Sequence, residues 1–137
     1  MATPEIDIAT HIANQLGALT LGTNCFHSPV RPANEAELIP AKAVFSYVTG
    51  GTTPYDYCGE DRAERRSRVQ VIVRGDRDDY AGTLSLARSI RDVVHRSDTT
   101  LTDYVQVRVM EEDPIPIGVD DQGLPMYSIN AELLFSE

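Results

Sequence analysis

The stretch "RVQVIVRGDRDDYAGTLSLARSIRDVV", residues 68–94, joins two different hydrophobic patterns. In its first part valines alternate with polar residues, which is typical of a strand with one buried face. After Gly75, apolar residues from Tyr80 to Val94 recur every three or four positions, as they do on one side of a helix. The stretch therefore predicts a strand that leads directly into an amphipathic helix.

Further strand patterns lie on both sides of this unit. "AKAVFSYV", residues 41–48, alternates with its aromatic residues on one face, and residues 104–110 and 126–135 alternate as well. We expect one face of the last two strands to point inward, through Val105, Val107, Val109, Tyr127, Ile129, Ala131, Leu133 and Phe135. A short strand is possible at residues 24–27, and residues 3–17 have helical spacing.

Clean alternation indicates a sheet that is covered on one face only, which favours antiparallel pairing. Two amphipathic helices are enough to cover that face. The sequence therefore predicts an α+β fold, a two-layer sandwich with a mainly antiparallel four- to five-stranded sheet and two helices on one face. The other face carries polar residues that meet either water or a neighbouring subunit: Arg68, Gln70, Arg74, Gln106, Arg108, Asn130 and Glu132.

Residues 49–67, "TGGTTPYDYCGEDRAERRS", show no apolar period. They combine glycines, a proline, two tyrosines and a cluster of mixed charges. We expect a long mobile loop at the edge of the sheet, because long loops in compact domains tend to be functional or disordered. The glycine pair at Gly50 and Gly51 is interpreted as a turn at the end of the preceding strand rather than as an anion-binding nest.

The chain has 137 residues, which suits one domain over residues 1–137. Its formal charge of −9 disfavours general nucleic-acid binding. No apolar run is long enough for a membrane span, and the first residues lack the layout of a secretory signal. We therefore expect no membrane partner, and free thiols at Cys25 and Cys58.

Five carboxylates and three prolines gather in "EEDPIPIGVDDQGLPMYSI", residues 111–129. A calcium loop is one interpretation, but Pro114 and Pro116 stand where an EF-hand would have to bend, and no closing glutamate follows. An acid–base pair has no surrounding pocket in its favour. Turn chemistry explains the stretch better: prolines hold an extended arm, Gly123 allows a reversal, and the charges face outward.

Sequence patterns for catalysis are missing from the chain. It contains no GxSxG elbow, no HExxH helix and neither of the common phosphate-binding glycine motifs. Its three histidines, His11, His27 and His95, are not spaced as metal ligands. We therefore expect no enzyme activity, no cofactor and no metal site.

Three segments in order, "FSYVTGGTTPYDY", residues 68–94, and "DPIPIGVDDQGLPMYSINAELLF", resemble the tail terminator and minor capsid proteins of lambda-like long-tailed phages. The resemblance covers residues 39–135. It implies an α+β subunit of a hexameric ring that caps the tail tube, ends its polymerisation and meets the head-side connector. It also implies a location at the head–tail junction of the virion, after synthesis in the bacterial cytoplasm.

Other functions remain open beside that one: another head–tail joining or minor capsid protein, or a small enzyme or metal-dependent domain with the same layout. For a ring subunit, we predict that two groups contact neighbouring copies or other partners. Their opposite charges would steer assembly and fix register. The loop group is Tyr55, Tyr57, Arg62, Arg65 and Arg66, and the arm group is Glu111, Glu112, Asp113, Asp120 and Asp121.

Overall fold

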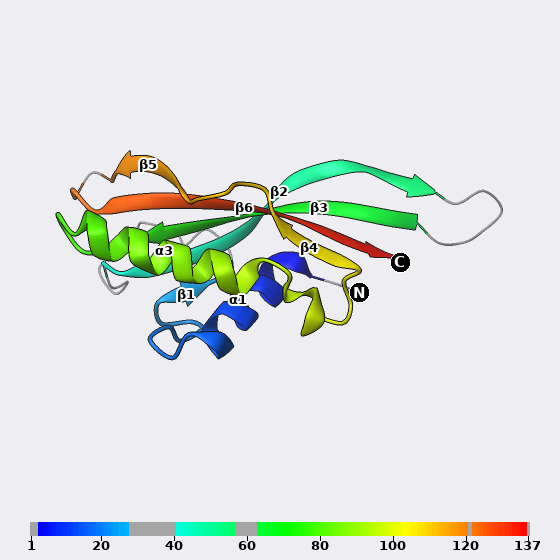
Figure 1. Cartoon of the computed structure of the whole chain (residues 1–137), viewed down its shortest axis with the longest axis horizontal. Helices are drawn as coiled ribbons and strands as arrows, with labels where there is room; N and C mark the ends of the chain where they lie inside the picture. The colour runs from blue at the N-terminus through cyan, green and yellow to red at the C-terminus, as the bar shows by residue number, and fades with distance from the viewer. Residues whose placement is uncertain (1–2, 28–40, 57–62, 121, 137) are drawn as a thin grey trace.

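A computed structural model describes residues 3–27, 41–56, 63–120 and 122–136 of the chain. Its elements are α1 (Pro4–Gln15), β1 (Cys25–Phe26), β2 (Ala43–Asp56), β3 (Ala63–Arg74), α3 (Tyr80–Val94), the 3-10 turn η1 (Ser97–Thr99), β4 (Gln106–Val109), β5 (Ile115–Val119) and β6 (Pro125–Ser136). The strands form one sheet in the order β1-β2-β3-β6-β4, with β5 also paired to β6. Both helices lie on the same face of this sheet (Figure 1). The predicted α+β class and its two layers are confirmed.

The core lies between the two helices and the sheet. The inward residues of β3 and β6 alternate as predicted, and Val69, Val71, Val73, Ile129, Ala131 and Leu133 are fully buried. They pack with Ile8 and Ile12 of α1 and with Ile90 of α3 in one cluster. Burial of this apolar surface is the main force that holds the helices on the sheet.

The strand-to-helix unit forms as its pattern indicates. Asp79 is the N-cap of α3, and its carboxylate accepts a hydrogen bond of 3.0 Å from the backbone N–H of Gly82. Gly75 lies directly under the first turn of α3, where a Cβ atom would overlap the side chain of Thr83. A glycine is needed there because the helix passes so close to the end of β3.

The sheet has six strands, more than the four or five predicted, because the proline-rich arm pairs with the last strand. Ile115 lies opposite Ser128 and Val119 opposite Pro125, while β4 pairs with the other half of β6. Residues 110–114 cross between β4 and β5, so the two short strands share one side of β6. The segment that was expected to be a connection thus contains an edge strand, β5, and residues 110–114 interrupt the edge between β4 and β5.

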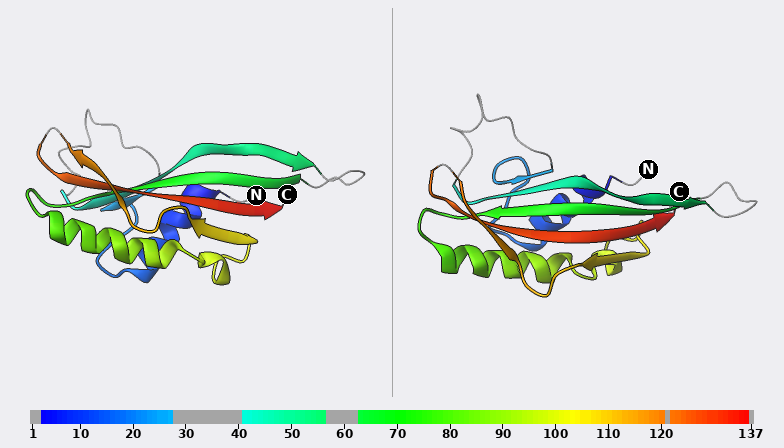
Figure 2. Two further views of the ribbon diagram at one scale, coloured as in Figure 1. Left: turned by 45° about the horizontal axis from the view of Figure 1, so that its top comes forward. Right: turned by 90° about the horizontal axis from the view of Figure 1, so that it is seen from above.

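The prediction of a long loop at residues 49–67 is wrong for most of its length. Residues 49–56 continue β2, and residues 63–67 begin β3, so the two strands form a long antiparallel hairpin. The hairpin runs beyond the helical layer (Figures 1 and 2). Neither of the described helices covers this end, so no apolar period is required of it, and register shifts at Val48/Gly51 and Thr52/Tyr55 disturb the alternation.

Phe45 and Tyr47 share one face of β2 as predicted, and it is the open face of the sheet, because their neighbours Val44 and Ser46 are the buried positions. Two details of the predicted core differ in the structure. Val105 is 66% exposed, since it lies before the first residue of β4. Tyr80 is half exposed because α3 begins there.

Cys25 is a buried free thiol, and burial raises its pKa to about 11. Cys58 lies outside the described residues. Within the described chain, neither helix has the length and apolar character required to cross a membrane.

Candidate assembly surfaces

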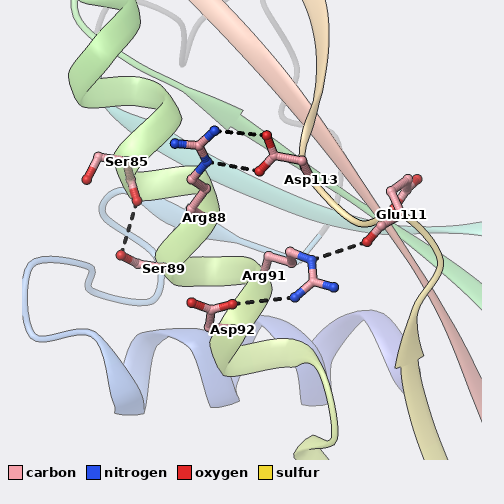
Figure 3. Close-up of polar contacts among 7 residues, drawn as sticks. All are labelled: Ser85, Arg88, Ser89, Arg91, Asp92, Glu111 and Asp113. Carbon is pink, nitrogen blue, oxygen red and sulfur yellow. Dashed lines mark hydrogen bonds and ion pairs between the residues drawn. The ribbon is translucent and has the colours of Figure 1, made fainter.

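Helix α3 holds the acidic connection between β4 and β5 in place (Figure 3). The Arg88 guanidinium donates two hydrogen bonds, of 2.9 and 3.0 Å, to the carboxylate of Asp113. One turn further on, Arg91 Nε donates to the backbone carbonyl of Glu111 at 3.2 Å. Two arginines three residues apart point to the same side of a helix, so both bind the connection, each at a different residue.

The pair between Arg88 and Asp113 is the best-formed ion pair of this region. Its hydrogen bonds and the opposite charge lower the pKa of Asp113 and raise the pKa of Arg88. The exposed fraction of the side chain is 57% for Arg88 and 50% for Asp113. Water screens such a pair, so its role is to fix geometry more than to add free energy of folding.

Glu111 repairs the interruption between β4 and β5. Its carboxylate accepts a hydrogen bond of 3.1 Å from the backbone N–H of Asn130 and a second, short one from the side-chain amide of the same residue. A backbone N–H at a sheet edge that has no neighbouring strand needs another acceptor. The side chain of Glu111 therefore replaces the missing strand at the centre of β6.

Asp120 begins the turn into β6. Its Oδ1 accepts hydrogen bonds of 2.9 Å from the backbone N–H groups of Gln122 and Leu124, and Gly123 takes a positive φ of 79°. The carboxylate also lies 3.8 Å from the guanidinium of Arg74. The predicted reversal at Gly123 is confirmed, and the aspartate is a turn-forming residue.

A chain of hydrogen bonds crosses the open face of the sheet from β2 to β6. The hydroxyl of Tyr47 donates to Gln70 Oε1 at 2.7 Å, and Gln70 Nε2 donates to the hydroxyl of Ser128 at 2.9 Å. Asn130 follows on the same strand and leads to Glu111. Polar residues on this face are thus ordered by one another as well as by water.

A group of arginines surrounds one glutamate further along the same face, and we call it the cationic cluster: Arg66, Arg68, Arg108 and Glu132. Glu132 lies 4.0 Å from Arg66, 3.9 Å from Arg68 and 3.7 Å from Arg108. Its side chain is only 16% exposed, whereas the arginines are between 47% and 54% exposed. Arg68 and Arg108 have this one carboxylate between them, so the two guanidinium groups carry more positive charge than Glu132 neutralises, in a chain of charge −9.

The opposite face carries an acidic patch, which we define as Glu5, Ile6, Asp7, Asp103 and Val105. The hydroxyl of Tyr104 joins its two segments by donating a hydrogen bond of 2.5 Å to Asp7. Burial, the bond to Asp7 and the charges of Asp7, Asp103 and Glu5 all raise the pKa of Tyr104. The two apolar members are exposed, Ile6 at 38% and Val105 at 66%.

The predicted contact residues divide into three groups. Tyr57, Arg62 and Asp121 lie outside the described residues, and of Tyr55 only the backbone in β2 is described. Arg65 and Arg66 lie in β3 opposite Phe135 and Leu134, and Glu112 is exposed.

The remaining three arm residues make contacts within the chain. Glu111 binds Asn130, Asp113 binds Arg88, and Asp120 forms the turn. The expectation of outward charges is wrong at Glu111, whose carboxylate points to the interruption in the sheet. The role of both groups in binding neighbouring subunits stays a prediction.

Sequence reasoning missed two arrangements. Arg88 and Arg91 were not expected to grip the arm, although their spacing on the polar side of α3 is a usable signal. The closeness of Glu5 and Asp7 in α1 to Asp103, far along the chain, was not expected either. Within the described residues, no group of three or more His, Cys, Asp or Glu side chains is placed to hold a metal ion.

A search of curated proteins found no match to this chain. The family model for the bacteriophage tail terminator protein matches residues 28–136, which include the whole sheet from β2 to β6. The chain therefore belongs to the bacteriophage tail terminator family and is a structural protein of the phage tail.

Proposed function

We propose that this chain forms a ring, most simply a hexamer, that caps the end of the tail tube and ends its polymerisation. The same ring would join the tube to the head-side connector protein at the head–tail junction of the virion. The family match over residues 28–136 is the observation that carries this proposal. The role is mechanical, so the proposal includes neither catalysis nor a cofactor.

The shape of the subunit supports a ring. One sheet face is used for the core, and the other presents an ordered polar network and a cationic cluster. A subunit with two different surfaces can make head-to-tail contacts, and such contacts close into a ring when the rotation between subunits allows it. A rigid frame also helps, because a ring must hold its diameter against the tube.

The acidic connection between β4 and β5 provides part of that rigidity. Arg88 and Arg91 tie residues 111–113 to α3, and Glu111 ties them to β6. We expect these contacts to hold helix, connection and sheet together as one rigid unit. A rigid subunit loses less conformational entropy on assembly than a flexible one, which favours a defined ring.

Native mass spectrometry and negative-stain microscopy of the purified protein, with and without purified tail tube, test the proposal. We expect a ring of fixed subunit number that is seen at one end of the tube. A protein that stays monomeric with the tube present and ignores its ends would contradict it. A ring that binds tube ends without stopping further addition of tube protein would instead indicate a joining role alone.

A further inference from the structure

The outer edges of the sheet are poorly suited to pairing with another chain. On one side β5 carries Pro116, which has no backbone donor, and a register shift before Gly118. On the other side the two-residue strand β1 covers β2 at Val44 and Phe45, and further along β2 has register shifts on both sides of Gly51 and Thr52. Prolines and bulges at edges are known protections against strand addition. Contacts between copies are therefore expected to use faces of the sheet rather than its edges.

Two faces at one end of the molecule have opposite charge. Arg108 and Glu132 lie opposite each other in neighbouring strands on the open face. On the helix side of the same strands, Phe135 packs against Tyr104, whose hydroxyl reaches Asp7. The cationic cluster and the acidic patch are thus back to back across the sheet, and a subunit cannot satisfy one with the other.

We infer that the cationic cluster of one subunit docks on the acidic patch of the next copy of the chain, which deepens the proposed ring. Arg68 and Arg108 provide the positive side, and they share the single carboxylate of Glu132. Glu5 and Asp103 provide the negative side. Ile6 and Val105, which are next to Asp7 and near Asp103 in sequence, are exposed and add apolar area to this side.

This contact is heterologous, because each copy uses a different patch on each side. Once the ring closes, every patch is paired with a patch on a neighbouring copy. The rotation between neighbouring copies therefore fixes the number of subunits. The opposite charges steer encounter and set register, while the apolar residues contribute affinity. The contact therefore predicts assembly that weakens as salt concentration rises.

Charge exchange tests the inference. The first variant carries Arg68→Glu and Arg108→Glu, and the second carries Glu5→Lys and Asp103→Lys. In each, like charges would face each other at every contact of the ring. We expect the protein concentration for half-assembly to rise roughly tenfold or more in low salt, measured by native mass spectrometry and light scattering. Combining all four substitutions in one chain should restore assembly.

Matched controls separate this effect from misfolding. Arg77→Glu and Asp76→Lys change exposed charges outside both patches and should leave assembly unchanged. Thermal melting of every variant as a monomer in high salt checks the fold. Arg68→Ala with Arg108→Ala is a milder alternative, with a smaller shift in the same direction.

Each outcome has one meaning. If wild-type protein forms rings and caps tubes but the reversed variants assemble equally well, this inference fails and the proposed function stands. The same holds if both variants are defective and the four-fold exchange does not restore assembly. If rings form normally but tube binding is lost on reversal of the arginines, the cluster docks the tail tube protein instead. If wild-type protein forms no ring and ignores tubes, the proposed function itself fails.

Discussion

The two faces of this sheet are built from neighbouring residues of the same strands, yet they serve different ends. On the covered face, residues such as Val71 and Leu133 are fully buried under the helices. On the open face, Gln70 and Glu132 are partly exposed and bind other polar side chains. Alternation along one strand thus separates what stabilises the subunit from what is available to a partner.

The comparison predicts that stability and assembly can be altered separately in this protein. Substitutions on the covered face should act on folding first. Substitutions on the open face should act on assembly and hardly on folding. The following experiments examine that separation, from the largest expected effect to the smallest.

Leu133 and Leu134 are neighbours that point to opposite faces. Leu133→Ala removes a fully buried side chain and should lower the free energy of unfolding by about 2–5 kcal/mol. Leu134→Ala makes the same chemical change on the open face, where the side chain is partly exposed, and should cost roughly 1 kcal/mol. Urea denaturation measures both. Equal losses would contradict the assignment of faces.

Glu111 and Glu112 give a second neighbouring pair. Glu111→Ala leaves the N–H of Asn130 without its acceptor and should cost about 1–3 kcal/mol. Glu112→Ala removes an exposed carboxylate and should change stability by less than about 0.5 kcal/mol. Hydrogen exchange at the amide of Asn130 should accelerate in the first variant alone. Unchanged exchange there would show that the carboxylate does not bridge the interruption.

Asp113 makes part of the stability depend on pH. Because Arg88 lowers the pKa of Asp113 in the folded chain, the pair stabilises the protein above the ordinary pKa of a carboxyl group. This contribution is lost as the pH falls through the lowered pKa. Asp113→Asn should therefore be less stable than wild type at neutral pH, and the difference should shrink in acid.

A double-mutant cycle with Arg88→Ala serves as the control for that experiment. In the Arg88→Ala background, Asp113→Asn should have a smaller effect at neutral pH, because the partner is gone. Denaturation curves recorded across the acid range give all four corners of the cycle. A pH dependence that survives loss of Arg88 would assign it to another group.

Arg108 should have the smallest effect on folding. It is 54% exposed and lies 3.7 Å from Glu132, so Arg108→Ala should change the free energy of unfolding by less than about 1 kcal/mol. The same variant should assemble less well than wild type. A large loss of stability would show that the cationic cluster serves folding and would weaken the contrast between the two faces.

The sequence was most informative where burial imposes a period. The inward residues of β3 and β6 and the spacing of α3 were predictable because each has a clear partner layer. The part of the β2–β3 hairpin at residues 49–56 and 63–67 was not predictable. It extends past the helices, so no helical layer imposes a period on it, and register shifts break the alternation. Strands without a core carry little hydrophobic signal.

The candidate surfaces were harder to predict for a different reason. Arg68 and Arg108 are 40 residues apart in sequence, and only the register of β3, β6 and β4 brings both to Glu132. The acids of the arm were recognised, but the arginines that bind these residues lie on a helix 20 and 25 residues earlier. Pairings between distant elements depend on topology, which local patterns do not specify.

Arrest of tube growth tests the central claim most directly. Purified tail tube protein is allowed to polymerise with increasing amounts of this chain, and tube lengths are measured by electron microscopy. We predict that tubes become shorter and stop growing, with a ring at one end, and that reversal of Arg68 and Arg108 abolishes the effect. Tubes that grow to the same length with and without the wild-type protein would contradict its proposed role as a tail terminator.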